Sequence, residues 1–187
     1  MPPLRNAAAT RERLLACART RFLQESYEAV GLREIARDAE VDVSLVGRYF
    51  GSKEQLFKAV LRKDGGDWKQ LAATAVDLPS FLAGLAISKD ASLDEGHVER
   101  LLIMLRSASS PQASALVRAS FGEDVLTPLS AVLSGENAQM RAAMALSVLM
   151  GTTVMRTIMN LDVLHECDAA AFQLRLEKLL SCALADR

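Results

Sequence analysis

Four side chains in the first third of the chain have the chemistry that binds phosphate groups or the base edges of DNA. Arg48 can donate hydrogen bonds to a guanine edge or to a phosphate, and the hydroxyl of Tyr49 can reach a phosphate. Lys53 follows Ser52 at the predicted start of a helix, where free amide groups and a cation together attract an anion. Arg33, in the first turn of an earlier predicted helix, is placed to reach the same groove.

Helical periodicity predicts three segments that position these side chains. A first helix is expected from Arg11 to about Glu25, capped by Thr10 and apolar along one face. A second helix is expected over 32–39 and a third over 43–49, joined by the three residues EVD. A short helix, a tight turn and another short helix behind a longer one form the outline of a helix-turn-helix.

The candidate recognition helix, 43–49, has an outer surface and a buried side. Val46 and Phe50 are expected to anchor it in the core, and Leu45 is ambiguous between core and surface. The outer or leading surface is formed by Val43, Ser44, Gly47 and Arg48. A glycine inside a helix costs roughly 1 kcal/mol relative to alanine. Because Gly47 has no Cβ, it allows the backbone to come close to DNA.

The rest of the chain is read as helix after helix. Ser52 is suited to cap a fourth helix, which Gly65–Gly66 end or bend. Further helices are expected over 77–88, 92–107, 110–121 with a continuation to about 133, 136–160 and 168–185. The sequence therefore predicts an all-α protein of about nine or ten helices, with an N-terminal three-helix head and a C-terminal helical bundle. The head is expected over 10–51, helix 52–64 as the link, and an effector-binding and dimerisation domain over 67–187.

Composition and charge agree with a helical protein that has an anionic partner. Half of the 187 residues are apolar and only 5% are aromatic. Residues 1–66 contain 12 Lys and Arg against 9 Asp and Glu, whereas residues 67–187 contain 10 against 14, so the first third is basic and the remainder acidic. A difference of a few charges is by itself a weak indication.

Compartment and membrane association follow from cysteine usage and hydropathy. Cys17, Cys167 and Cys182 are an odd set without CxxC spacing, which suits reduced thiols. No apolar stretch reaches the roughly 18 residues that cross a bilayer, and the N-terminus lacks the apolar core of a signal peptide. We expect a cytoplasmic protein without membrane contact.

The N-terminal part of the sequence resembles a known family. The segment RERLLACARTRFLQESYEAVGLREIARDAEVDVSLVGRYFGSKEQLFKAVL is similar to the DNA-binding head of TetR-type transcriptional regulators. The shared features are the Tyr-x-x-x-Gly segment from Tyr27 to Gly31, the REIA of the second helix, an Ala-x-Val turn, the Tyr-Phe pair and the Ser-Lys-Glu-x-Leu that starts helix four. The resemblance covers about residues 10–61, and beyond them only the inferred architecture is similar.

The resemblance implies a set of DNA contacts and two departures from the family pattern. The implied contacts are Arg33, Val43, Ser44, Leu45, Gly47, Arg48, Tyr49 and Lys53. Gly31 stands where the family usually has a Ser or Thr that caps the second helix and bonds a phosphate, and Gly47 stands where a tyrosine is frequent. Because each departure removes an expected phosphate contact, Arg48, Tyr49 and Lys53 are expected to provide more of the affinity for DNA.

The resemblance further implies a homodimer on a palindromic operator in double-stranded DNA. The last two helices would form a four-helix bundle with those of a second subunit, and paired recognition helices about 34 Å apart would read successive half-sites. The stretch QMRAAMALSVLMGTTVMRTIM supports this independently, because it is small and apolar around much of its circumference. The expected interface residues are Ala143, Ser147, Gly151, Met155, Phe172, Leu176, Leu179 and Ala183. The alternative is the core of a monomeric bundle.

A small-molecule effector of unknown identity is the third implied partner. Met-rich walls suit adaptable binding of apolar molecules. The candidate wall residues are Phe81, Leu85, Leu101, Met104, Leu105, Phe121, Met144 and Met155, each of which can also be plain core. The resemblance then implies a repressor that the effector releases from DNA.

Two other classes of function compete with this interpretation. A helical protein-interaction module with a degenerate DNA-binding head is favoured by Gly31 and Gly47. An enzyme is not expected, because the sequence has no phosphate loop, no metal signature and no Cys/His dyad in a plausible local context. His97 and His165 lie far apart without a metal-binding spacing, so neither a metal nor a cofactor is predicted.

Overall fold

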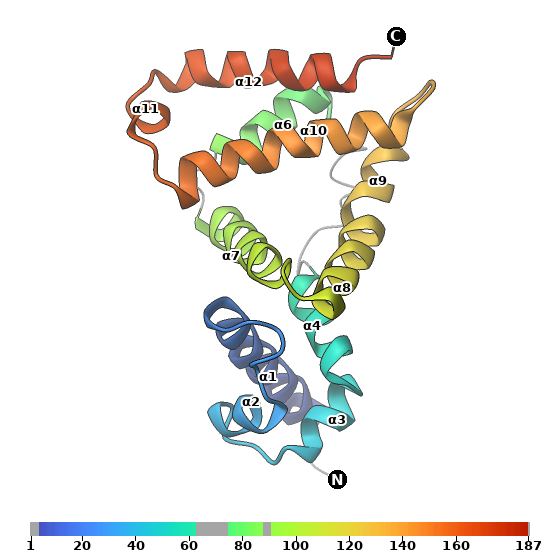
Figure 1. Cartoon of the computed structure of the whole chain (residues 1–187), viewed down its shortest axis with the longest axis vertical. Helices are drawn as coiled ribbons and strands as arrows, with labels where there is room; N and C mark the ends of the chain where they lie inside the picture. The colour runs from blue at the N-terminus through green and yellow to red at the C-terminus, as the bar shows by residue number, and fades with distance from the viewer. Residues whose placement is uncertain (1–3, 63–74, 88–90, 187) are drawn as a thin grey trace. The chain divides into compact units, whose positions relative to one another are not determined.

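The fold is all-α, as predicted. The computed structural model describes residues 4–62, 75–87 and 91–186, and these contain no strand (Figure 1). Consecutive helical residues form ten runs within these ranges. The elements are α1 Leu4–Gln24, α2 Leu32–Asp38, α3 Ser44–Phe50, α4 Lys53–Leu61, α6 Leu78–Ile87, α7 Ala91–Ser107, α8 Pro111–Phe121, η1 Gly122–Leu126, α9 Thr127–Ser130, α10 Ala138–Thr153, η2 Val154–Ile158, α11 Asp162–His165 and α12 Ala169–Leu184, where η marks a π-helical segment.

The chain forms two compact units, each built from two separate segments. The head unit comprises Met1–Lys63 and Glu99–Ser120, and the second unit comprises Asp64–Val98 and Phe121–Arg187. The head unit therefore includes the second half of α7 and nearly all of α8. The fourth helix was expected over 52–64, but α4 ends at Leu61, because Arg62 is already extended. Gly65–Gly66 and the predicted domain start at residue 67 lie outside the described residues.

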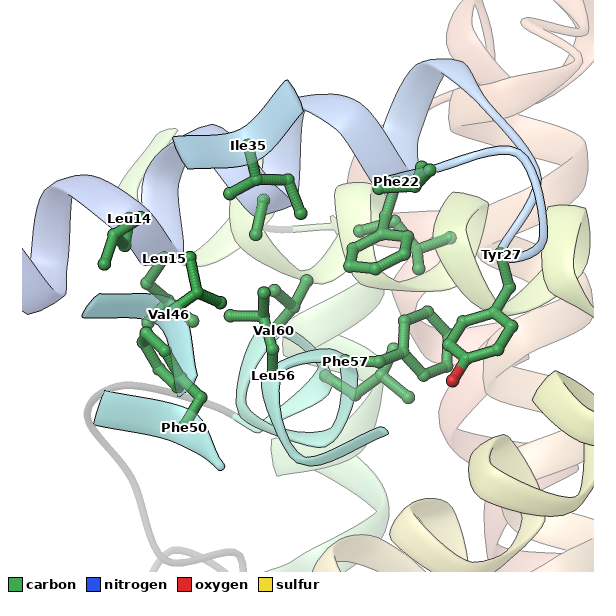
Figure 2. Packing of buried hydrophobic residues seen from close by; sticks show 14 of the residues in the cluster. Leu14, Leu15, Phe22, Tyr27, Ile35, Val46, Phe50, Leu56, Phe57 and Val60 are labelled. Atoms are coloured by element: carbon green, nitrogen blue, oxygen red, sulfur yellow. The ribbon is translucent and has the colours of Figure 1, made fainter. Parts of the chain in front are cut away.

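The head unit is held together by an apolar core with an aromatic centre. The Phe22 and Phe57 rings meet edge to face with centroids 4.9 Å apart, and Tyr27 meets Phe57 at the same distance (Figure 2). Burying a large apolar side chain contributes about 1.5–3 kcal/mol, and edge-to-face ring pairs add to that. Ile103 and Ala113, from α7 and α8, are also fully buried in this core.

The turn between α2 and α3 has the geometry of a helix-turn-helix. Glu40 takes a left-handed conformation with φ 53°, and the Val41 amide donates to the Ala36 carbonyl at 2.9 Å, which closes α2. The Asp42 carboxylate then accepts from the Ser44 amide at 2.8 Å and satisfies a free donor at the start of α3. These contacts end one helix and begin the next within five residues.

Several sequence-based helix bounds differ from the structure. The first helix begins at Leu4, so the prediction that Thr10 caps it is wrong. Ala7, Ala8 and Ala9 are strong helix formers, and they extend the helix past the predicted start. The helix expected over 136–160 begins at Ala138, after Asn137 in a left-handed conformation, and ends in η2. The short helix α11 was not predicted.

The second unit packs α6, α10 and α12 against one another (Figure 1). Its core contains Leu82, Leu146 and Leu180, and the Ser80 hydroxyl donates to the Glu177 carboxylate at 2.8 Å between α6 and α12. The buried Arg141 of α10 donates to the carbonyl of Leu184, at the end of α12, at 2.9 Å. No helix among the described residues is long and apolar enough to span a membrane.

Candidate nucleic-acid interface

The third helix presents a polar, exposed face and anchors itself with two buried side chains. Ser44, Gly47 and Arg48 are exposed, and their spacing of three and four residues places them on one side of α3. Val46 and Phe50 are buried in the core of the head unit, as the periodicity predicted. The two anchors hold a seven-residue helix that is too short to be stable alone.

The remaining predicted contacts of this helix differ in their exposure to solvent. Val43 is exposed at the N-terminal end of α3, whereas Leu45 and Tyr49 are half-buried against the head core. Leu45 thus lies at the edge of the core, which explains why the sequence pattern fitted both a core and a surface position. Tyr49 packs its ring against the same edge.

Arg11 is a cation beside the third helix that the sequence did not single out. Its guanidinium carbon lies 5.1 Å from the centroid of the Phe50 ring. Such a cation–π contact is worth about 0.5–1 kcal/mol at an exposed site. Phe50 therefore anchors α3 in the head core, and its ring also contacts the guanidinium of Arg11. Sequence spacing cannot reveal the contact, because 39 positions separate the two residues.

Two glycines shape α3 in different ways. A Cβ built on Gly47 meets no atom within 4 Å, so open space surrounds this backbone. Gly51 ends the helix with φ 79°, a conformation that residues with a Cβ rarely adopt. Gly51 is therefore required by the backbone, whereas nothing within the chain requires a glycine at position 47.

Lys53 is the most constrained of the predicted contacts. Its ammonium group lies 4.6 Å from the centroid of the Tyr27 ring and donates to the Glu28 carbonyl at 3.4 Å. Burial lowers the pKa of the Lys53 ammonium, and the carboxylates of Glu28 and Glu54 oppose that shift. The same burial raises the pKa of the Tyr27 hydroxyl to about 12, so the ring remains neutral beneath the cation.

Gly31 is the N-cap residue of α2 and offers no side chain to cap the helix. The Glu34 carboxylate instead reaches back and accepts from the Gly31 amide at 3.1 Å, which is one half of a capping box. Arg33, in the first turn of α2, is exposed. The caps of α4 are more regular, because the Ser52 hydroxyl accepts from the Gln55 amide at 3.2 Å as predicted.

The candidate effector residues do not form one cluster. Phe81, Leu85 and Phe121 pack at the edge of the second unit's core, and Met104 packs against the head core. Leu101 is buried, while Leu105, Met144 and Met155 are about half exposed. No group of three or more His, Cys, Asp or Glu side chains among the described residues is arranged to hold a metal ion.

The candidate interface residues divide between surface and core. Ser147, Gly151, Met155 and Leu179 are exposed, and Leu176 is buried in the core of its own unit. Ala143, Phe172 and Ala183 are half-buried. Five of the exposed positions on α10 and η2 recur at three- and four-residue spacing and form one row, here called the methionine row, which consists of Met140, Met144, Ser147, Gly151 and Met155.

Comparison with known proteins places both parts of the chain in one family. The family model of the bacterial regulatory proteins of the TetR family matches residues 14–60. The model of the tetracyclin repressor-like C-terminal domain matches residues 82–181, more than half of the chain. No curated protein sequence matches the chain.

Solved structures share the fold over nearly the full length. A TetR-family regulator from Streptomyces coelicolor is 27% identical, with 95% of each chain covered and a TM-score of 0.52. SmeT in its triclosan complex is 20% identical, with 95% of this chain and 93% of that chain covered and a TM-score of 0.68. NalD from Pseudomonas aeruginosa is 17% identical, with 97% and 98% covered and a TM-score of 0.65.

The helix-turn-helix head and the helical second unit define a DNA-binding transcriptional regulator. The chain belongs to the TetR family, as its sequence suggested. Proteins of this family are transcription regulators, not enzymes.

Proposed function

We propose that the protein is a cytoplasmic, homodimeric repressor that a small apolar effector releases from a palindromic operator. One observation supports the DNA-binding surface above all. Ser44, Gly47 and Arg48 form an exposed row on α3, while Val46 and Phe50 are buried and anchor the helix. Arg48 is assigned to a base edge or a phosphate, and Tyr49, Lys53 and Arg33 to phosphates. Val43, Ser44 and Leu45 lie at the leading end of the helix and complete the surface.

A mobility-shift assay with DNA from beside the protein's own gene tests this surface. We expect a sequence-specific shift at moderate salt, because specific binding persists where attraction to phosphates is screened. Arg48→Ala should weaken the shift by about tenfold or more, since a good base contact is worth about 1–3 kcal/mol. Arg118→Ala, which removes an exposed arginine from α8, serves as the matched control. A specific complex that tolerates Arg48→Ala contradicts the assignment.

The methionine row supports the homodimer. Exposed apolar side chains in one continuous row favour a partner helix, and Ser147 and Gly151 within the row allow two helices to approach closely. Leu179 on α12 is a further apolar side chain of the same unit that is more than half exposed. A second copy is the proposed occupant, because paired heads match the two half-sites of a palindrome.

Analytical ultracentrifugation tests the dimer. Met144→Glu should shift the protein toward monomers, because two like charges would be buried across a symmetric interface. Gln139→Glu adds the same charge to an exposed position of α10 outside the row and should leave the dimer intact. A wild-type protein that sediments as a monomer at micromolar concentration argues against the proposal.

An effector site in the second unit is proposed around Phe81, Leu85 and Phe121. These side chains are partly buried at the edge of its core, and SmeT, which shares the fold, forms a complex with triclosan. NalD, another structure of this fold, is the secondary repressor of a multidrug efflux pump. A thermal-shift screen of apolar compounds should find stabilising ligands, and the same ligands should abolish the mobility shift. Ligands that stabilise the protein but leave DNA binding unchanged contradict release by the effector.

A further inference from the structure

Three polar contacts attach the turn between α7 and α8 to the end of α1, to the loop between α1 and α2 and to the start of α4. The Arg106 guanidinium donates to the carbonyl of Gln24, the last residue of α1, at 2.9 Å. The Ser110 hydroxyl donates to the Glu28 carboxylate. The segment 106–112, here called the corner, thus contacts the end of α1 and the loop that leads to α2.

The third contact joins the corner to the start of α4. The side-chain amide of Gln112 donates to the Glu54 carboxylate at 3.0 Å, and Glu54 stands in the first turn of α4 next to Lys53. Ile103 and Ala113 on either side of the corner are fully buried in the head core. Packing on both sides therefore holds the corner against the head core, next to the residues with which it makes polar contacts.

The Ser110 hydroxyl accepts one hydrogen bond and donates another. Its hydroxyl oxygen accepts from the Ala113 amide at 3.1 Å, as a helix N-cap does for α8, and its hydrogen is donated to Glu28. The side chain of Ser110 is almost completely buried. This hydrogen bond is the main reason that the pKa of the Glu28 carboxyl lies below its usual value, so the bond is charge-assisted.

Glu28 contacts Ser110 and Lys53 with two different groups. Its carboxylate binds the corner, while its backbone carbonyl accepts from the Lys53 ammonium and the neighbouring Tyr27 ring lies beneath the same ammonium. A shift of the Glu28 backbone therefore changes both contacts at once. The position of the Lys53 ammonium depends on a loop that the corner holds in place.

We propose that Ser110 and Glu28 are positioning residues for DNA binding, which hold the Lys53 ammonium where it reaches a phosphate. The inference rests on the proposed phosphate contact of Lys53. A lysine side chain has many rotamers, and one that is already ordered loses less entropy when it binds. The corner, which follows the recognition helix by more than fifty residues, then contributes to affinity without touching DNA.

The salt dependence of binding to a labelled random-sequence duplex separates positioning from folding. Each phosphate contact adds about 0.9 to the slope of log K against log salt concentration. Lys53→Gln should lower the slope by about one. Glu28→Ala should lower it equally, and Glu28→Ala combined with Lys53→Gln should lower it no further. A loss of folded protein reduces the apparent K at every salt concentration and leaves the slope unchanged.

Matched variants control for charge and for the helix cap. Glu28→Gln removes the same charge as Glu28→Ala but keeps an oxygen that accepts from Ser110, so it should retain the wild-type slope. Ser110→Thr keeps the hydroxyl and the cap and should also retain it, whereas Ser110→Ala should lower the slope by about one.

The outcomes distinguish the inference from the proposed function. If Lys53→Gln leaves the slope unchanged, Lys53 binds no phosphate, and both the assignment and the inference fail. If Lys53→Gln lowers the slope but Glu28→Ala does not, the phosphate contact stands and the positioning role is overturned. A double variant whose slope falls by about two overturns it as well, because the two residues then act independently.

Discussion

The Arg21 guanidinium donates two hydrogen bonds to the Asp38 carboxylate, from Nε to Oδ2 at 2.6 Å and from Nη2 to Oδ1 at 3.0 Å. Arg21 belongs to α1 and Asp38 ends α2, so this bidentate pair joins the two helices behind the recognition helix. A further bond from Arg21 to Glu25 at 3.0 Å holds the guanidinium in one orientation. Arg21 lowers the pKa of the Asp38 carboxyl.

This pair predicts a loss of stability in acid. Because the pKa of Asp38 is lower in the folded than in the unfolded protein, its contribution is complete above the ordinary carboxyl pKa near 4 and is lost as the pH falls through the folded value. Asp38→Asn should be less stable near neutral pH and should lose less stability on acidification. Urea unfolding at a series of pH values measures this, and parallel curves for both proteins would contradict it.

Gly47 gives a test in which stability and DNA binding move in opposite directions. Gly47→Ala should raise the free energy of unfolding by about 0.5–1 kcal/mol, because the new methyl group meets no atom and the helix interior favours alanine. If the backbone approaches DNA here, the same variant should bind DNA more weakly. Denaturant unfolding and mobility shift measure the two effects.

Gly84 in α6 provides the matched control for Gly47. A Cβ built on Gly84 also meets no atom within 4 Å, and the residue belongs to the second unit. Gly84→Ala should raise stability by a similar amount without a change in DNA affinity. Unchanged affinity in both variants would mean that no close approach of DNA occurs at position 47.

Gly31→Ser should strengthen the start of α2. The new hydroxyl can accept from the Glu34 amide while the Glu34 carboxylate keeps its bond to the amide of residue 31, which completes the capping box. We expect a gain of a few tenths of a kcal/mol, since glycine is itself an acceptable N-cap, and tighter DNA binding from a new phosphate donor. The Cβ would lie 3.1 Å from Glu34 Oε2, the oxygen that accepts from this amide, so the carboxylate must shift by a few tenths of an ångström to keep its bond. A less stable variant would show that Glu34 is displaced.

Arg11 is predicted to contact a phosphate beside the end of α3. Arg11→Gln should lower the salt-dependence slope by about one, whereas Arg13→Gln on the same helix keeps its neighbour at Phe50 and should lower the slope less. The loss of stability should stay below about 1 kcal/mol, the usual size of an exposed cation–π contact. Equal slopes for the two variants would leave Arg11 with a packing role only.

Arg141→Met should destabilise the second unit. It leaves the carbonyls of Leu184 and Ser134 without their donor, at a cost of about 1–3 kcal/mol for a buried group. Arg141→Lys should recover part of the loss, because one ammonium cannot reproduce a planar guanidinium that serves two acceptors. Thermal unfolding ranks the three proteins, and an Arg141→Met variant as stable as wild type contradicts the role.

The sequence predicted the head well because its helices are periodic and its turn is short. The third helix was expected over 43–49 and spans 44–50, with Val46 and Phe50 buried as predicted. The cap at Ser52 also follows from local chemistry. These features depend on residues a few positions apart, and local sequence carries that information.

The contacts that the sequence missed join residues far apart in the chain. Helical periodicity predicted the helices α7 and α8 but not what they pack against, so the burial of Ile103 and Ala113 in the head core was not foreseen. The hydrogen bond from Lys53 to a backbone carbonyl and the contact of Arg11 with the Phe50 ring were not foreseen either. A backbone carbonyl has no sequence signature, and any exposed arginine on α1 is an equal candidate until the fold is known.

The division of the head unit between two chain segments affects how it is synthesised. When α4 leaves the ribosome, Ile103 and Ala113 have not yet been translated, so the core that they close remains open on that side. The nascent chain must extend to about residue 120 before the head unit is complete. A message with a premature stop before Glu99 would therefore yield an unfinished core that chaperones and proteases recognise, rather than an independent DNA-binding fragment.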